Sequence, residues 1–290
     1  MKVKLYFSLI LLMPLLFVPD VFSENHKVIY SVSAYWGLPR VEGYVIKNNN
    51  LYICLAEEDK EKRTQRQVFS NKVIYKVENY KLQPAADLTA EEAKDYIEKN
   101  KNNVINNLWW EYFEPMNGTF VGLGKNLLKL KDNVYIERIP SGTKYDPVTF
   151  LNMDTNLRMS DYSFWAYLMT YVYIENNNIY FDGSSEKHKK QGIFTYNMNT
   201  GEVSEVACSY FNPREPFKDG NLWPSSVSYK NPVRIPNTPY LLFCIDKSVN
   251  NGVYDEYKNA KWHSFEHYDI KNYFEIAIIE IPEWKVKTMR

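Results

Sequence analysis

The chain has 290 residues, of which 45% are hydrophobic, 16% are aromatic and 24% are charged. These proportions are typical of a globular protein that can bury a core, and they exclude an intrinsically disordered chain. The 35 lysine and arginine residues balance the 35 acidic residues, so the sequence lacks the basic excess of a nucleic-acid binder. Aromatic side chains pack well on a pleated surface, so their abundance favours strands.

The first 23 residues are typical of a secretory signal peptide. Two lysines precede an apolar segment at residues 5–17, and residues 21–23 offer small and apolar side chains to a signal peptidase. The apolar segment is shorter than the roughly 20 residues of a membrane-spanning helix, which is the alternative. We therefore expect cleavage after Ser23 and no stable membrane insertion. Residues 24–290 would then form a single extracytoplasmic domain, either periplasmic or secreted.

Most of the remaining chain predicts short strands. Runs of β-branched and aromatic residues recur between asparagine, glycine, proline and aspartate residues, which are typical of turns. The predicted strands are residues 28–32, 44–47, 51–55, 72–77, 134–139, 171–175, 179–182, 193–198, 202–206, 240–246 and 274–281.

Asparagine clusters separate several of these strands. Two apolar runs flank residues 48–50, two more flank residues 176–178, and a weaker copy flanks Asp132 and Asn133. Asparagine tolerates a positive φ, so each cluster predicts a tight hairpin.

These hairpins recur along the chain with a regular period. The last asparagine of each turn is Asn50, Asn133 or Asn178, and these positions are 83 and 45 residues apart. The spacing corresponds to two repeats and one repeat of about 40–50 residues. Residues 193–206 are similar to the outer hairpin of many propeller blades. The chain therefore resembles β-propeller repeat proteins as a broad class, and the resemblance implies a mostly β, propeller-like arrangement of antiparallel hairpins. An irregular β-sandwich is the alternative fold.

One segment departs from the strand pattern. Thr89 and Glu92 form a capping box, in which each residue would bond the other's backbone N–H at the start of a helix. Apolar residues then recur at helical spacing as far as Val104 and Leu108. We expect a helix from residue 90 to near residue 110, as an insertion near residues 89–112 packed on a sheet edge or over one mouth of the propeller.

The three cysteines, Cys54, Cys208 and Cys244, each lie beside apolar residues. An oxidising compartment would allow one disulfide with three possible pairings. The apolar neighbours favour three buried thiols instead.

One segment matches a metal-binding pattern. His263-Ser-Phe-Glu-His267 fits H-x-x-E-H, the inverted zinc peptidase pattern. On a helix His263 and His267 would share a face and could bind zinc, with Glu266 as the base that activates a metal-bound water. The third ligand would have to come from the acidic residues that follow, Glu275, Glu280 or Glu283. The alternative, which we favour, is a surface histidine pair with no cofactor.

Aromatic residues give the other candidate site. Trp109, Trp110 and Tyr112 follow the predicted helix, and adjacent tryptophans cannot both face inward from one helical stripe. Exposed Trp and Tyr side chains are typical anchors for protein and glycan ligands. The alternative is that these rings fill spaces between sheets.

No complete catalytic constellation appears in the sequence, so we do not expect an enzyme. The expected function is non-enzymatic binding of a protein or glycan ligand outside the cytoplasm. Two alternatives stay open: a periplasmic inhibitor or immunity-type protein, and a secreted hydrolase that uses a metal held by residues 263–267.

Overall fold

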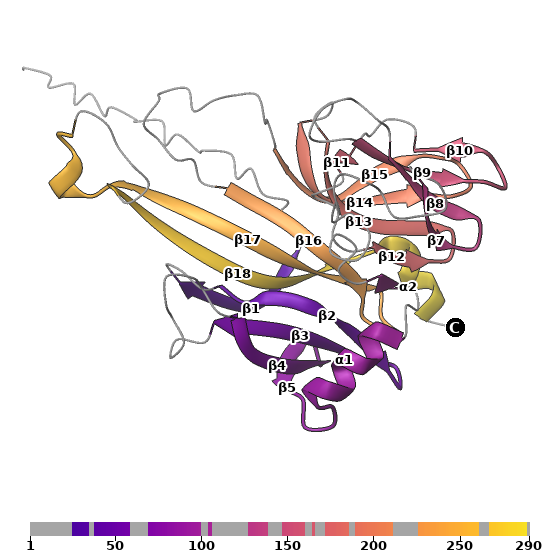
Figure 1. The fold of residues 1–290 in the computed structure, drawn as a ribbon, viewed down its shortest axis with the longest axis horizontal. Helices are drawn as coiled ribbons and strands as arrows, with labels where there is room; N and C mark the ends of the chain where they lie inside the picture. The colour runs from indigo at the N-terminus through magenta and orange to yellow at the C-terminus, as the bar shows by residue number, and fades with distance from the viewer. Residues whose placement is uncertain are drawn as a thin grey trace, which may run out of the picture.

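The structure is a computed structural model of the chain. It describes residues 25–34, 38–58, 69–99, 104–105, 127–138, 147–159, 164–165, 172–185, 189–210, 226–260 and 267–288. The signal peptide predicted at residues 1–23 lies outside these ranges and stays a prediction. Strands predominate in the described residues and form three antiparallel sheets (Figure 1). None of the helices in this part of the chain is long and apolar enough to cross a membrane.

The first sheet, which we term the amino-terminal sheet, is a meander of four strands in chain order. Its strands are β2 (Arg40–Lys47), β3 (Asn50–Glu58), β4 (Phe69–Glu78) and β5 (Lys81–Pro84). Asn48 and Asn49 have φ values of 51° and 60° in the turn between β2 and β3. The hairpin predicted from the first asparagine cluster is therefore confirmed.

The second sheet, which we term the central sheet, joins the two ends of the described chain. Its strand order is β1-β18-β17-β16, with bounds Lys27–Ala34, Tyr268–Glu280, Tyr240–Val253 and Ser226–Arg234. The 3-10 helix η4 (Asp255–Tyr257) lies at the tip of the long β17–β18 hairpin. The helix α2 (Pro282–Thr288) follows β18. β16 was not predicted, because Asn231 and Pro232 interrupt its apolar pattern. The structure has a register shift at this point, and a bulge is a position where a strand tolerates proline.

The third sheet has ten strands. Four of its strands pair side by side in chain order, and this first succession is β12 (Val172–Glu175), β13 (Asn178–Ser185), β14 (Lys190–Asn197) and β15 (Val203–Tyr210). The other is β7 (Leu127–Lys131), β8 (Val134–Arg138), β9 (Pro147–Asn152) and β10 (Leu157–Arg158). The short strand β11 (Phe164–Trp165) pairs with both β9 and β13 and so links the two successions. Positive φ values at Asp132 and Asn176 confirm the two other predicted hairpins.

The helix predicted near residue 90 begins as expected but ends earlier. α1 spans Ala90–Lys99. Its capping box is present, with the Thr89 N–H donating to Glu92 Oε2 at 2.8 Å and the Glu92 N–H donating to Thr89 Oγ1 at 3.2 Å. The predicted continuation to residue 110 is wrong, because residues 104–105 form β6 (Val104–Ile105) and pair with β12. Two β-branched side chains suit a strand better than a helix.

α1 packs on a face of the amino-terminal sheet rather than on a sheet edge. Ala93 is buried against Val45, Tyr52 and Ile74 of β2, β3 and β4. The Tyr96 hydroxyl donates to the backbone carbonyl of Ile46. The helix therefore covers the outer face of this sheet.

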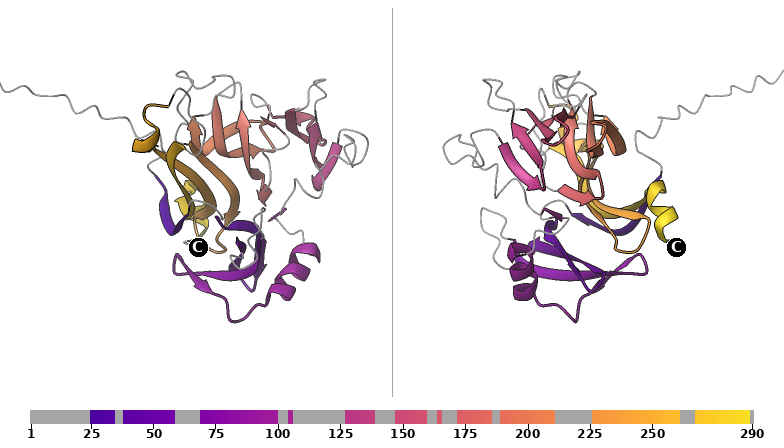
Figure 2. Two further views of the ribbon diagram at one scale, coloured as in Figure 1. Left: turned by 60° about the vertical axis from the view of Figure 1, so that its left-hand side comes forward. Right: turned by 90° about the vertical axis from the view of Figure 1, so that its right-hand side faces the viewer.

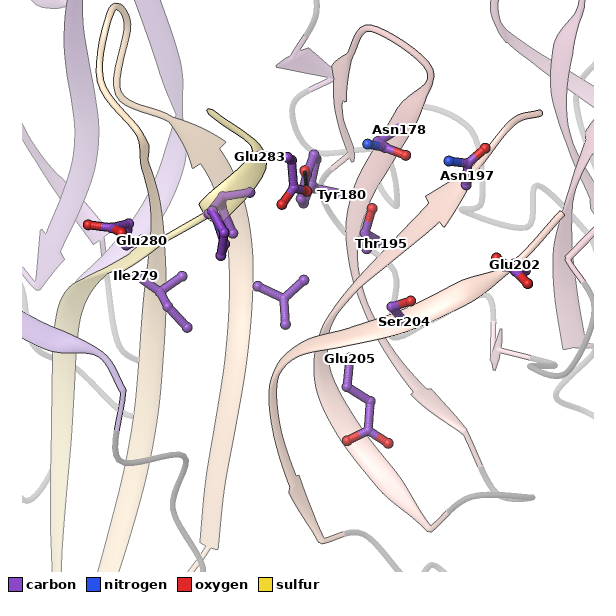
Figure 3. A pocket seen from close by; sticks show the side chains of 13 residues that line it. Asn178, Tyr180, Thr195, Asn197, Glu202, Ser204, Glu205, Ile279, Glu280 and Glu283 are labelled. Atoms are coloured by element: carbon purple, nitrogen blue, oxygen red, sulfur yellow. Dashed lines mark hydrogen bonds between the residues drawn. The ribbon is translucent and has the colours of Figure 1, made fainter. Parts of the chain in front are cut away.

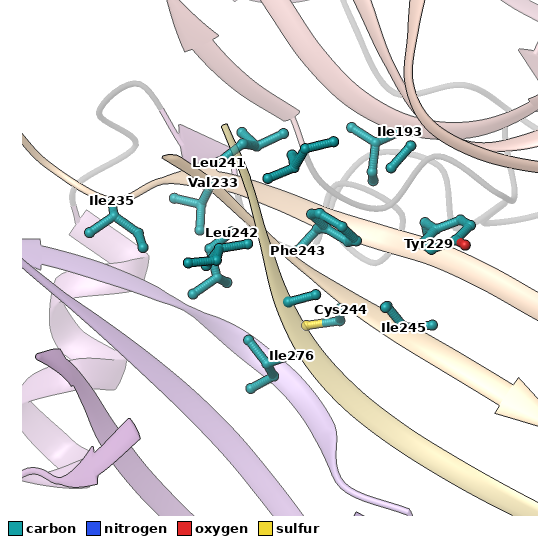
Figure 4. Packing of buried hydrophobic residues seen from close by; sticks show 14 of the residues in the cluster. Ile193, Tyr229, Val233, Ile235, Leu241, Leu242, Phe243, Cys244, Ile245 and Ile276 are labelled. Atoms are coloured by element: carbon teal, nitrogen blue, oxygen red, sulfur yellow. The ribbon is translucent and has the colours of Figure 1, made fainter. Parts of the chain in front are cut away.

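The central sheet is covered on both faces, by the amino-terminal sheet on one side and the ten-stranded sheet on the other (Figure 1, Figure 2). The largest core cluster draws on all three sheets. Figure 4 shows Leu242 and Cys244 on the side of the amino-terminal sheet and Phe243 on the side of Ile193. Residues 241–245 are all buried. Successive side chains of a strand point to opposite faces, so this unbroken apolar run fits a strand that is covered on both faces.

The mostly β fold class is confirmed, in several antiparallel sheets. The propeller-like arrangement stays a prediction. Cys54, Cys208 and Cys244 lie on three different sheets, in β3, β15 and β17, and all three are free thiols. Burial raises the pKa of the Cys54 thiol to about 12, so the thiol is protonated at neutral pH.

Candidate functional site

An open cleft of about 420 Å³ lies between the ten-stranded sheet and the carboxyl end of the central sheet (Figure 3). One wall is the face of β13, β14 and β15. The other wall is formed by residues 279–283, where β18 ends and α2 begins. The two walls are more than 70 residues apart in sequence and come together only through packing of the sheets.

Strand register makes the first wall polar. Tyr180 of β13 is paired with Thr195 of β14, and Thr195 is paired with Ser204 of β15. Asn178 is likewise paired with Asn197. Alternate residues of a strand share one face, so these hydroxyl and amide groups form two polar rows across the wall.

Four carboxylates line the cleft, and no lysine, arginine or histidine is among the lining residues that the structure describes. They are Glu202, Glu205, Glu280 and Glu283. Two of them have a lysine partner outside the lining: Lys190 Nζ is 3.6 Å from Glu205, and Lys285 Nζ is 3.0 Å from Glu280. These pairs are exposed, and exposed ion pairs contribute at most about 1 kcal/mol. The carboxylates can therefore exchange these lysines for a cationic ligand at little cost.

A neutral tyrosine supports one of these carboxylates. The Tyr180 hydroxyl donates to Glu283 Oε1 at 3.2 Å. Burial raises the pKa of Tyr180, and the nearby Glu283 carboxylate raises it further. The hydroxyl therefore stays protonated at neutral pH and remains a hydrogen-bond donor that holds the Glu283 side chain in the first turn of α2.

A buried aromatic and charged cluster anchors α2 against the cleft. Trp284 is almost completely buried, its ring lies 5.0 Å from the Tyr180 ring, and Arg234 Cζ lies 4.6 Å from the Trp284 centroid. Arg234 Nη1 donates to Glu175 Oε1 at 2.7 Å, and the Tyr173 hydroxyl donates to Glu175 Oε2 at 2.5 Å. The cluster links β12, β13 and β16 to α2, so the second wall of the cleft is held firmly in place.

The aromatic site predicted at Trp109, Trp110 and Tyr112 lies outside the described residues and stays a prediction. His263 and Glu266 lie outside them as well. His267 is described, and its ring stacks on Tyr257 with the ring centroids 4.1 Å apart.

The structure separates His267 from two of the glutamates considered as a third zinc ligand. His267 immediately precedes β18, and Glu280 is the last residue of that strand. At about 3.3 Å per residue, the strand places Glu280 roughly 40 Å from His267 and Glu275 roughly 25 Å away. Neither can share a metal ion with His267. No group of three or more His, Cys, Asp or Glu side chains that could hold a metal ion occurs in the described part of the chain.

The cleft was not predicted from the sequence. Its one local signal is the alternation of Asn178 and Tyr180 with apolar residues in β13. No family model, no curated protein and no solved structure matches the chain. The chemistry of the cleft is therefore the basis for assigning a function.

Proposed function

We propose that this protein is an extracytoplasmic binding protein, without enzymatic activity, that takes a cationic segment of a protein ligand into the cleft. The observation that carries the proposal is the lining of the cleft by four carboxylates and no cationic side chain among its described residues. A lysine or arginine side chain of the ligand would complement this charge, and such complementarity provides both specificity and a fast association rate.

The polar rows of the first wall support the same proposal. Asn178 and Asn197 present amide groups, and Ser204 presents a hydroxyl group, beside the carboxylates (Figure 3). These groups can hydrogen-bond the backbone of an extended ligand segment while the carboxylates hold its charged side chains. A periplasmic inhibitor of a basic effector protein is a special case of this function.

We also propose the propeller-like arrangement expected from the sequence. Its support is the chain order of the four-stranded units β2–β5, β7–β10 and β12–β15, followed by β16–β18. β1 completes the last unit by pairing with β18. In a ring of blades the first strand of a chain can complete the last blade in this way. The signal peptide predicted at residues 1–23 is the support for an extracytoplasmic location.

Calorimetry with charged peptides tests the binding proposal. Residues 24–290 are titrated with a hexapeptide of alternating lysine and serine, and with the same peptide carrying glutamate in place of lysine. We expect binding of the basic peptide only, weakened by salt because the charges are exposed. The double variant Glu202→Gln/Glu205→Gln removes two carboxylates, each of which contributes about 0.5–1 kcal/mol, and should bind about five- to thirtyfold more weakly.

The matched control is Glu91→Gln/Glu256→Gln, which removes two exposed carboxylates on α1 and η4, outside the cleft lining. It should bind like the unaltered protein. Equal weakening by both double variants, or no binding of the basic peptide, would overturn the proposal.

A further inference from the structure

The turn between β4 and β5 places a tyrosine where the backbone favours glycine. Glu78 pairs with Lys81, so the turn has two central residues, Asn79 and Tyr80. Their φ values are 51° and 56°. A two-residue hairpin with positive φ at both positions is a type I′ turn, for which Asn-Gly is the preferred sequence. Asparagine suits the first position, but a bulky side chain at the second is an outlier. The chain therefore keeps Tyr80 at a position that disfavours it.

The Tyr80 side chain lies against the central sheet and remains accessible. Its ring centroid is 5.0 Å from that of Tyr240, the first residue of β17, with the planes at 71°. Tyr80 is nevertheless 38% exposed. One ring contact therefore leaves much of this aromatic side chain open to a ligand, and strained residues of this kind cluster at ligand sites.

The two tyrosines line a pocket of about 300 Å³. The rest of the lining consists of Ile278 and the polar side chains of Asn25, His26, Lys27 and Glu280. This volume is at the lower end for ligand pockets, which combine apolar surface with a few polar groups. With His26 counted as neutral, the lining carries one cationic side chain, Lys27, and one anionic side chain, Glu280, and so has no excess charge of either sign.

We infer that this pocket binds a neutral sugar unit of a glycan. The C–H face of a pyranose packs on a tyrosine ring, and its hydroxyl groups need both donors and acceptors. Asn25 and Lys27 supply donors, and Glu280 supplies an acceptor. The inference rests on this pocket alone and does not depend on the ligand of the acidic cleft.

The variant Tyr80→Gly separates a binding role from a structural one. Glycine adopts a positive φ without steric strain, so the melting temperature should stay the same or rise by about 2 °C. Glycan affinity should fall at least tenfold, because the ring is gone. A tyrosine retained only for its contact with Tyr240 would give the opposite pattern, with a lower melting temperature and unchanged affinity.

The probe is an array of neutral oligosaccharides of glucose, N-acetylglucosamine, galactose and mannose, followed by calorimetry with the strongest binder. Asn79→Gly is the matched control, since it changes the same turn and keeps the ring, and it should bind normally. Tyr240→Leu is the second variant if Tyr80→Gly fails to fold, and it should also weaken binding at least tenfold. Failure of residues 24–290 to bind any oligosaccharide on the array, or equal binding by the tyrosine variants, would overturn the inference.

Discussion

Replacement of Trp284 by alanine should strongly destabilise the protein, because this side chain fastens α2 to the rest of the fold. Trp284 is 1% exposed and contacts the rings of Tyr180 and Tyr173 and the guanidinium group of Arg234. Truncation of a buried tryptophan to alanine costs about 3–5 kcal/mol. The loss of the cation–π contact adds about 0.5–1 kcal/mol. We therefore expect a decrease of about 3.5–6 kcal/mol in the free energy of unfolding.

Such a loss is a large part of the roughly 5–15 kcal/mol that stabilises a typical domain. It should lower the melting temperature by roughly 10 °C or more, at about 2–4 °C per kcal/mol for a chain of this size. The assay is urea unfolding followed by near-ultraviolet circular dichroism, with thermal unfolding in parallel. Lys285→Ala is the control, because Lys285 lies on the same helix but is exposed, and its effect should stay within about 0.5 kcal/mol. A loss below about 1 kcal/mol for Trp284→Ala would refute the account of α2 as part of the core.

Three further predictions concern the backbone and the thiols. Gly192→Ala should destabilise the protein by more than about 3 kcal/mol in urea unfolding, since Gly192 has φ of 146° and a Cβ atom there would lie 2.1 Å from the Ala207 carbonyl oxygen. A mild effect would contradict this close approach. The thiols of Cys54 and Cys244 should resist a disulfide reagent at pH 8 in the native protein, while three thiols per chain react in guanidinium, because burial raises the pKa of both to about 12. A single reactive thiol after denaturation would instead reveal a disulfide. The contribution of these protonated thiols to the free energy of unfolding should be fully present below pH 9. It should be lost as the pH rises toward 12, because the folded state holds the thiol protons more tightly than the unfolded chain does. Melting temperatures that stay constant from pH 8 to 11 would count against this linkage.

The sequence predicts those parts of the fold that local chemistry determines. The hairpin at Asn48 and Asn49 follows from the tolerance of asparagine for positive φ, and the start of α1 follows from the capping box of Thr89 and Glu92. In each case the deciding interaction lies within a few residues of the chain. Such elements can be predicted without knowledge of their neighbours.

Elements that depend on distant partners could not be predicted in this way. Val104 continues the helical spacing of α1, yet it pairs with Tyr173 in the structure, and the sequence between them does not indicate this pairing. The acidic cleft is a stronger case, because Glu205 and Glu283 belong to separate segments that only sheet packing brings together. The tyrosine pocket had a local signal in Asn79-Tyr80, where glycine is expected after asparagine.

The two proposed sites meet at one point of the fold. Glu280 ends β18 and lines both the acidic cleft and the tyrosine pocket. Its strand position is fixed by pairing with Tyr240, which carries one ring of the tyrosine pocket, while the next residues lead into α2. The variant Trp284→Ala, which loosens α2, should therefore disturb both sites, because Glu280 belongs to both linings. Tyr80 lies on the amino-terminal sheet and lines only the pocket, so its removal should leave binding of the basic peptide unchanged. If loosening of α2 weakens both peptide and glycan binding, while removal of Tyr80 weakens only glycan binding, the two sites are separate but share one strand end.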